Sequence, residues 1–328
     1  MEISKGEYRE LGKSGIMVSP ISLGCWQYSR DSNFVSMDDR ESIKIIRSSI
    51  EMGINFFDTA ESYGKGHSEE VLGEAIRQSG KDVVIATKVR EYNLAPQSMV
   101  SSVEMSLRRL KKDVIDLYQI HWPTAKLDMR LSMETLMDLK MQGKIRAIGV
   151  SNFNISEIKL LQEVGDITSL QSPYNLFWRC LEEVFAYCYS NNISVLSYSP
   201  LGHGLISGRF DRMNRQPKRP AQQDSYLFKE PYYDMALPVL DAVNEVAQRY
   251  GSTITQVAIA WLLGKKAVSS VVMGVSNQEQ LGQNIGAVFL KLSQDDIQKL
   301  EQAGGMILNS INAQMSKSLW NWWPDKDE

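Results

Sequence analysis

Short apolar runs rich in β-branched residues recur along the chain, and between them lie segments whose apolar residues repeat every three or four positions. Runs of the first kind are typical of buried strands, and segments of the second kind are typical of amphipathic helices. Strands are predicted at residues 21–24, 55–58, 83–87, 114–121, 145–150, 169–172, 194–198 and 269–273. Helices are predicted at residues 40–52, 69–77, 97–110, 131–142, 155–164, 181–191, 236–250, 254–263 and 277–288.

Strands that alternate with helices of this length indicate parallel βαβ units, and eight units favour an α/β fold closed as a (β/α)8 TIM barrel. An open, doubly wound sheet is the alternative, because periodicity alone does not prove closure. We expect a single domain over residues 1–328, since no linker interrupts the alternation. Residues 210–231 are predicted to form a long loop on the catalytic face, and residues 8–18 a hairpin that closes the bottom of the barrel. The tryptophan-rich tail at 319–328 is predicted to fold over a pocket.

Two residues mark expected helix ends. Ser68 has the side chain of a good N-cap for the helix at 69–77, whose first turn carries two glutamates. Gly53 follows the helix at 40–52, where a left-handed residue at the C-terminus would favour glycine.

Composition narrows the function classes. A net charge of −3 leaves no basic excess to neutralise a phosphate backbone, which argues against nucleic acid as the main partner. Three scattered cysteines, Cys25, Cys180 and Cys188, fit a reducing compartment better than a disulfide framework. The charged N-terminus lacks the apolar core of a signal peptide, and no apolar stretch reaches the length of a membrane span. A cytoplasmic protein is therefore expected.

Common nucleotide, metal and hydrolase motifs are missing. Residues 202–208 and 6–14 come near to a dinucleotide fingerprint and a P-loop, but both have the wrong spacing. The three histidines, His67, His121 and His203, include no pair with metal-ligand spacing, so a metal site is not expected. A G-x-S-x-G nucleophile motif is also absent.

Four polar residues lie where predicted strands end. Asp58 ends the second strand and Tyr63 follows it in the loop, Lys88 ends the third, and His121 ends the fourth. In a (β/α)8 barrel these carboxyl ends form one face, and active sites are built there from several strands. Each residue alone has an ordinary structural interpretation, as a turn, surface or wall residue. Their placement on successive strand ends favours a shared site.

The chemistry of the four residues is coherent. A buried Asp and a buried Lys compensate each other as a pair. A lysine ammonium beside a phenol favours phenolate, so we expect the pKa of Tyr63 to be lowered towards working pH. A neutral His121 facing the same point would orient a carbonyl group and share its developing negative charge. These residues predict a proton donor and oxyanion site for carbonyl reduction.

Seven segments, in order, resemble the aldo-keto reductase superfamily, with its bacterial and potassium-channel β-subunit branches nearest in character, and the resemblance extends over nearly the whole chain. The resemblance implies that Asp58, Tyr63, Lys88 and His121 form the catalytic tetrad, with Tyr63 as general acid and base. The segments read INFFDTAESYGKGHSEEVLGEAI, VVIATKV, DLYQIHWP, GKIRAIGVSNF, LQSPYNL, SYSPLGHGLISGRF and GVSNQEQLGQNIGA.

The resemblance also implies a nicotinamide cofactor that lies extended across the barrel mouth, which would explain the missing dinucleotide fingerprint. The resemblance implies that the carboxamide of the nicotinamide is hydrogen-bonded by Ser151, Asn152 and Gln171. Tyr198 would stack on the nicotinamide ring and position the hydride. Ser199, Leu201 and Gly204 are expected to belong to a loop that wraps the pyrophosphate, and Arg209 to pair with its charge. The adenosine end of the cofactor is expected to lie against Gly274, Ser276, Gln280 and Asn284.

One position departs from the family pattern. Many members carry Arg or Lys beside the residue equivalent to Ser276, where it grips the 2′-phosphate of NADP, whereas this chain has Asn277. The channel-subunit branch resembles this chain in having Ser-Asn there and binds NADP(H). We therefore expect NADP(H), with NAD(H) as the alternative.

Three functions compete. The first is an oxidoreductase for a small carbonyl or alcohol substrate (an aldehyde, ketone, sugar or polyol), and the complete tetrad favours it. The second is a cofactor-binding regulatory module like the channel β subunits, and the third is a barrel without a ligand. Trp26 and Trp122 adjoin strand ends and are predicted to line the substrate pocket, with core packing as the alternative; Trp178 is a weaker candidate.

Overall fold

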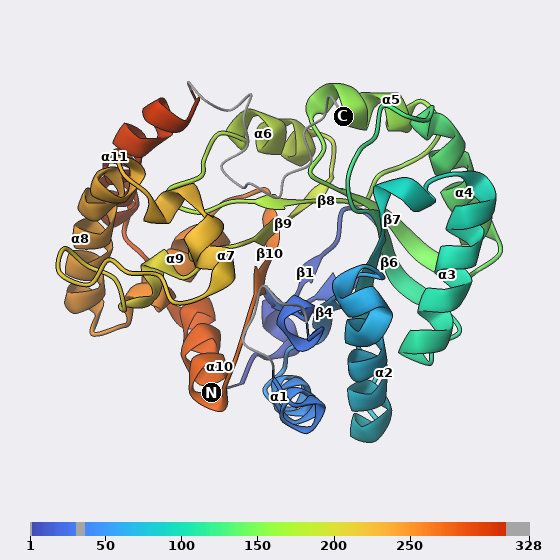
Figure 1. Cartoon of the computed structure of the whole chain (residues 1–328), viewed down its shortest axis with the longest axis horizontal. Helices are drawn as coiled ribbons and strands as arrows, with labels where there is room; N and C mark the ends of the chain where they lie inside the picture. The colour runs from blue at the N-terminus through green and yellow to red at the C-terminus, as the bar shows by residue number, and fades with distance from the viewer. Residues whose placement is uncertain (1, 31–36, 313–328) are drawn as a thin grey trace.

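The computed structural model describes residues 2–30 and 37–312 and contains a closed barrel of eight parallel strands (Figure 1). The strand order is β10-β3-β4-β5-β6-β7-β8-β9, and β10 closes the ring by pairing Val271 with Ile21. Closure confirms the predicted TIM barrel and rules out the open sheet. The strands are β3 (Ile21–Gly24), β4 (Phe56–Asp58), β5 (Val84–Val89), β6 (Ile115–Ile120), β7 (Ile145–Ser151), β8 (Ser169–Pro173), β9 (Ser194–Tyr198) and β10 (Val268–Met273).

Helices surround the barrel and cover the outer faces of its strands (Figure 1). Each predicted helix is present, with ends shifted by a few residues at most. The helices are α1 (Asp39–Glu51), α2 (His67–Ser79), α3 (Pro96–Leu110), α4 (Met129–Met141), α5 (Ile155–Gln162), α6 (Glu182–Ser190), α7 (Pro220–Asp224), α8 (Tyr232–Tyr250), α9 (Ile254–Leu263), α10 (Gln278–Gly286) and α11 (Gln294–Asn312).

Two helices lie where the pattern predicted none. The stretch at 210–231 is not wholly irregular, because α7 and the 3-10 turn η6 (Tyr226–Phe228) form inside it. Arg219 and Pro220 begin α7, since proline is well suited to the first turn of a helix. Helix α11 follows the last barrel unit and packs along α8. The predicted cover at 319–328 lies outside the described residues.

An antiparallel hairpin seals the bottom of the barrel. Strands β1 (Arg9–Glu10) and β2 (Met17–Val18) pair there, as predicted. Leu11, Ile16 and Val18 are buried and share one cluster with apolar side chains from the barrel strands, among them Phe56 and Leu196. The floor of the barrel is therefore apolar, and polar side chains occupy its other end.

The two expected helix ends had different outcomes. Gly53 adopts a left-handed conformation (φ 84°) after α1, where a Cβ atom would collide with the backbone of Ile3, so that prediction is confirmed. The N-cap prediction for Ser68 is wrong, because α2 begins two residues earlier than predicted, at His67, and its N-cap is Gly66. The Ser68 hydroxyl instead donates to the carbonyl of Cys25 and accepts from Thr59 (both 2.8 Å), so it joins the helix to the barrel.

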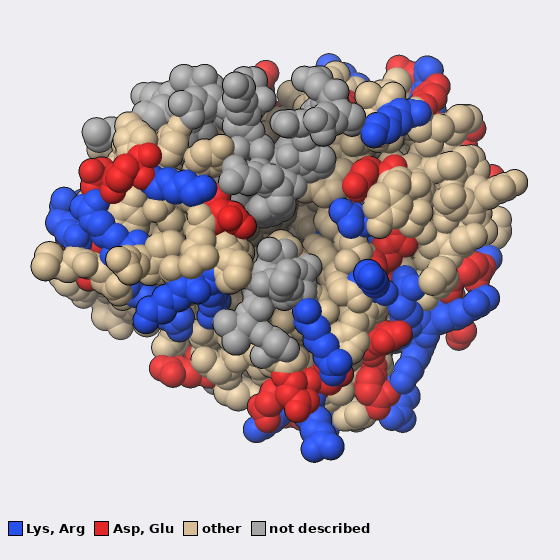
Figure 2. Space-filling model, viewed as in Figure 1, with Lys and Arg blue, Asp and Glu red and all other residues tan. Residues whose placement is uncertain are grey.

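Charges of both signs are intermingled over the face of the molecule seen in Figure 2. Of the helices within the described residues, none is both long and apolar enough to cross a membrane.

The floor cluster yields a stability prediction. Replacing Leu11 by alanine (Leu11→Ala) removes most of a fully buried side chain and leaves a cavity in the floor cluster. We expect the free energy of unfolding, measured by denaturant titration, to fall by about 2–5 kcal/mol. The control is Met17→Ala in the same hairpin, where the side chain is 45% exposed and the change should stay within about 0.5 kcal/mol. Equal effects of the two variants would contradict a sealed apolar floor.

Candidate active site

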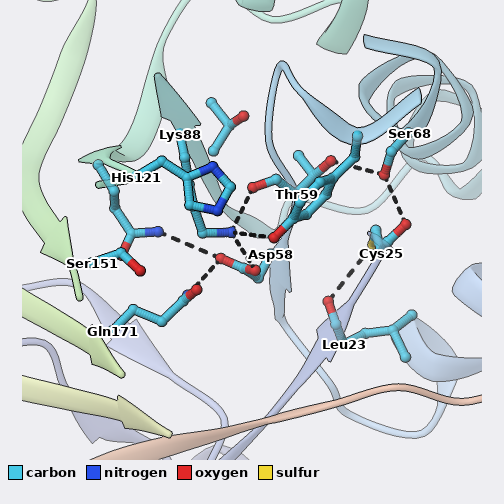
Figure 3. Close-up of polar contacts among 12 residues, drawn as sticks. Leu23, Cys25, Asp58, Thr59, Ser68, Lys88, His121, Ser151 and Gln171 are labelled. Atoms are coloured by element: carbon cyan, nitrogen blue, oxygen red, sulfur yellow. Dashed lines mark hydrogen bonds and ion pairs between the residues drawn. The ribbon is translucent and has the colours of Figure 1, made fainter. Parts of the chain in front are cut away.

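The four predicted catalytic residues converge at the carboxyl ends of β4, β5 and β6. Asp58 is the last residue of β4, Lys88 lies one residue before the end of β5, and His121 follows β6 directly. Tyr63 begins the short turn η3 (Tyr63–Gly66). Figure 3 shows Asp58, Lys88 and His121 pointing into one space. The predicted spatial arrangement is therefore present.

Lys88 is the centre of this group. Its ammonium nitrogen lies 2.7 Å from Asp58 Oδ1, 2.9 Å from the carbonyl oxygen of Thr59 and 3.4 Å from the Tyr63 hydroxyl. The side chain of Lys88 has no exposed surface, and that of Asp58 is 4% exposed. Burial of both charges is costly unless they are paired and hydrogen-bonded, which these contacts achieve.

The other oxygen of Asp58 accepts from two side-chain amides. Gln171 Nε2 donates to Asp58 Oδ2 at 2.8 Å, and Gln119 Nε2 lies 3.4 Å from the same oxygen. Gln119 was not among the sequence candidates. A usable signal existed, because Gln119 stands two residues before His121 on one strand and alternate residues share a face.

Burial dominates the protonation behaviour of Tyr63. It raises the pKa of the Tyr63 hydroxyl above its ordinary value, and the opposing effect of the Lys88 charge is too small to reverse this. The expected lowering is therefore wrong as a net direction, although Lys88 acts in that direction. For Lys88, burial is outweighed by Asp58 and Tyr63, so its pKa is raised and the ammonium stays charged.

His121 is held neutral. Burial lowers its pKa well below the ordinary value, and the positive charges of Lys88 and Arg90 add to that effect. Its Nδ1 atom is buried and has no hydrogen-bond partner among the described residues. A neutral ring offers one N–H group as a donor, which agrees with the expectation from sequence.

Two tryptophans frame the site. The Trp26 ring stacks on Tyr63 with centroids 5.6 Å apart, and the Trp122 ring stacks on His121 with centroids 6.1 Å apart. Both tryptophans therefore contact residues of the predicted tetrad, and Trp122 is itself only 7% exposed. Trp178 is only 3% exposed and forms a backbone bridge with Asn175 in the loop after β8, which fits core packing.

Residues predicted to hold the carboxamide lie at the ends of the next strands. Asn152 Nδ2 donates to Ser151 Oγ (3.0 Å), and the Tyr198 hydroxyl donates to Asn152 Oδ1 (2.8 Å). Gln171 lies beside them on β8, where its amide nitrogen is already engaged by Asp58. The structure thus brings all four predicted residues to one side of the mouth.

The predicted pyrophosphate loop follows β9. Ser199 and Gly204 adopt left-handed conformations (φ 50° and 89°), which curl the backbone back over the strand ends, and Leu201 lies between them. Arg209 is exposed beyond this loop. Burial lowers the pKa of Arg219, and the positive charge of Arg209 lowers it further. Arg219 was not predicted, since it lies in a stretch interpreted only as a loop.

The predicted adenosine end lies at the start of α10. The backbone N–H of Ser276 donates to Gln280 Oε1 (2.8 Å), while the Asn277 side chain caps the helix by accepting from the backbone of Gln280 (2.9 Å). Gly274 is exposed at the end of β10, and Asn284 is buried in α10. Asn277 is thus the N-cap of α10, and its neutral side chain adds no charge to this end of the mouth.

The described residues contain no group of three or more His, Cys, Asp or Glu side chains that could hold a metal ion.

The sequence model of the Aldo/keto reductase family matches residues 20–304. The chain belongs to this family. As a member, this aldo-keto reductase is an NAD(P)-dependent oxidoreductase that acts on carbonyl groups.

Relatives of the reductase span most of its length. It is 35% identical to the aldo-keto reductase YhdN of Bacillus subtilis (strain 168), over 84% of this chain and 86% of the relative. It is 31% identical to the NADH-specific methylglyoxal reductase of Escherichia coli (strain K12), over 87% and 94%. It is 30% identical to a probable voltage-gated potassium channel subunit beta of Arabidopsis thaliana, over 86% and 91%.

Solved structures share the barrel. The glycerol dehydrogenase AKR11B4 from Gluconobacter oxydans superposes with a TM-score of 0.83 at 28% identity, covering 92% of this chain and 95% of that one. An aldo/keto reductase from Klebsiella pneumoniae, in complex with NADP and acetate, superposes with a TM-score of 0.73 at 27% identity, covering 90% and 94%.

His203, in the loop after β9 of the reductase, yields a pH prediction. Burial lowers its pKa from 6.5 to about 3, against a hydrogen bond with the carbonyl of Ala221. Between these values the His203 side chain binds more protons in the unfolded chain, so its contribution lowers folded stability as the pH drops from 6.5 towards 3, by at most about 1.4 kcal/mol per pH unit. We expect His203→Asn, which tolerates the left-handed backbone there (φ 54°), to lose less stability in that window. Denaturant titrations at about pH 7 and about pH 4 measure this; equal slopes for both proteins would contradict it.

Proposed function

We propose that this reductase interconverts a small carbonyl compound and its alcohol, with Tyr63 as the proton donor in reduction. The observation that carries the proposal is the buried chain from Asp58 through Lys88 to the Tyr63 hydroxyl. Tyr63 keeps its proton at rest because burial raises its pKa. The phenolate left after proton transfer would be stabilised at once by the adjacent ammonium of Lys88.

The reaction needs one proton and one hydride for each carbonyl group. When bound, the nicotinamide cofactor supplies the hydride to the carbonyl carbon. Tyr63 gives its proton to the carbonyl oxygen, and the neutral His121 ring donates a hydrogen bond to the same oxygen. In the reverse direction the Tyr63 phenolate takes the alcohol proton. Trp26 and Trp122 would flank the substrate and keep water from the reacting atoms.

Residues of the remaining strand ends fit a dinucleotide. Ser151, Asn152 and Tyr198 offer a carboxamide both donors and acceptors beside an aromatic ring. Arg209 and Arg219 place positive charge near the loop that would surround the pyrophosphate. A helix N-terminus at α10 would favour the phosphate of the adenosine end.

NADP(H) is the cofactor we favour. The Klebsiella pneumoniae neighbour was solved with NADP, and the arginine pair suits the more anionic cofactor. NAD(H) is the alternative, since a relative of similar identity is named NADH-specific and Asn277 brings no charge. The regulatory role suggested by the channel-subunit relative is less favoured, because a pure binding module does not need the buried ion pair beneath Tyr63.

Substitution of Tyr63 by phenylalanine tests the proton donor. Tyr63→Phe keeps the ring that stacks on Trp26 and removes the hydroxyl, so we expect kcat to fall at least about 100-fold. Binding of NADPH, measured by tryptophan fluorescence, should stay unchanged. The control is Tyr92→Phe, the same substitution at an exposed tyrosine. A Tyr63→Phe protein with near-normal turnover of aldehydes and ketones would remove Tyr63 from this role.

Asn277 tests the cofactor preference. Asn277→Arg puts a guanidinium at the start of α10, and we expect the ratio of kcat/KM for NADPH over NADH to rise about tenfold, the scale of one charge-assisted hydrogen bond. Asn277→Ser is the control, because serine keeps a capping side chain without adding charge. If the ratio were the same in both variants, the side chain would not face the 2′-phosphate.

A further inference from the structure

A second buried polar cluster lies behind the site, between the barrel wall and the helices α2 and α3. Glu69 in α2 has no exposed side-chain surface, and Arg109 in α3 is 14% exposed. Arg109 Nε lies 2.6 Å from Glu69 Oε2, while the Thr87 hydroxyl on β5 donates to Glu69 Oε1 at 2.6 Å. None of these side chains belongs to the predicted tetrad, and a carboxylate in this position is expensive to bury.

The position of Glu69 connects the two segments that carry Tyr63 and Lys88. Thr87 directly precedes Lys88, and neighbouring strand residues point to opposite faces, so one backbone segment fixes Thr87 outside and Lys88 inside the barrel. Glu69 itself stands in the first turn of α2, three residues after the end of the turn that Tyr63 begins. A single carboxylate therefore joins the base of that turn to β5.

The Tyr63 turn has a backbone that needs external support. Gly64, Lys65 and Gly66 all have left-handed conformations (φ 58°, 57° and 94°), which is unfavourable for the lysine in particular. Arg109 packs directly against Gly66, where an added Cβ atom would lie 2.6 Å from Arg109 Cδ and Nε. Because Glu69 holds Arg109 in place, it supports the turn on one side and β5 on the other.

We propose that Glu69 is a positioning residue, which sets the contact between the Tyr63 hydroxyl and the Lys88 ammonium through Arg109 and Thr87. The inference rests on the proposed function, in which Tyr63 donates the proton. The Tyr63–Lys88 contact is 3.4 Å long, so a small displacement of either segment breaks it. Proton transfer would then suffer while the predicted cofactor residues, which lie on β7 to β9 and in the segments that follow β7, β9 and β10, stay in place.

The first test is Glu69→Gln, which keeps the shape of the side chain and removes its charge. We expect kcat for a carbonyl substrate to fall about 10- to 100-fold, the cost of misplacing a reacting group by about 1 Å. The Kd for NADPH should stay within about twofold of the wild type, because the cofactor residues lie on other strands. A loss of general structure would instead weaken cofactor binding together with turnover.

The matched control is Asp116→Asn. Asp116 on β6 is also a largely buried carboxylate that pairs with an arginine, Arg146, at 2.6 Å, and it also contacts β5, accepting from the backbone of Ile85 at 2.9 Å. It lies towards the opposite end of the strands from the site. We expect Asp116→Asn to lower the free energy of unfolding and leave kcat unchanged.

Thr87 tests the link to β5 without a change of charge. Thr87→Val removes the hydroxyl that donates to Glu69, so kcat should fall, as it does in Glu69→Gln. Thr87→Ser keeps a hydroxyl, so its kcat should stay close to that of the wild type. If the two residues act as one unit, the loss in the Glu69→Gln/Thr87→Val double variant will be smaller than the product of the single losses. If Glu69→Gln does not accumulate as folded protein, the Val and Ser variants of Thr87 decide.

The outcomes separate the two proposals. Normal kcat in Glu69→Gln, or in Thr87→Val, with an active wild type would overturn the positioning role alone. A kcat loss in Asp116→Asn equal to that in Glu69→Gln would also overturn it, since loss of any carboxylate paired with an arginine beside β5 would then have the same effect. A wild type that binds NADPH but turns over no carbonyl or alcohol would overturn the proposed function, and the inference with it.

Discussion

The buried ion pair between Lys88 and Asp58 is the constraint around which the upper half of the barrel is organised. Neither charge can be solvated, so each must be satisfied by protein groups. The Thr59 carbonyl and the Tyr63 hydroxyl accept from the ammonium, and two glutamine amides approach the far side of the carboxylate. The polar groups that satisfy the ion pair are thus gathered at the mouth of the barrel, and the apolar side chains are left to fill its floor.

The fold was largely predictable from sequence, for a physical reason. Parallel strands buried on both faces form continuous apolar runs, and each helix between them must show one apolar face, so the alternation is visible without tertiary information. The tetrad was predictable because strand ends meet at one face. Helix α11 was not predicted, because two consecutive glycines, Gly304 and Gly305, weaken the helical pattern of its sequence. In the structure, Gly304 lies where the helix closely approaches the backbone of Leu176, so that a side chain would not fit.

The errors have a common cause, which is competition between local and tertiary interactions. Ser68 has the right chemistry for an N-cap, but its hydroxyl is engaged by Thr59 and Cys25. The net effect on the pKa of Tyr63 depends on burial as well as on Lys88, and burial is not visible in a motif. Gln119 and Arg219 belong to the same class, since their places depend on how strands and loops pack and not on their neighbours in the chain.

The two oxygens of Asp58 face different halves of the mouth. Oδ1 binds Lys88, on the side of the proposed proton donor, and Oδ2 binds Gln171, on the side of the predicted carboxamide site. One carboxylate is thus a common reference point for both halves. A displacement of β4 would therefore act on Lys88 and Gln171 together, and the geometry of the two halves would be coupled through this one side chain.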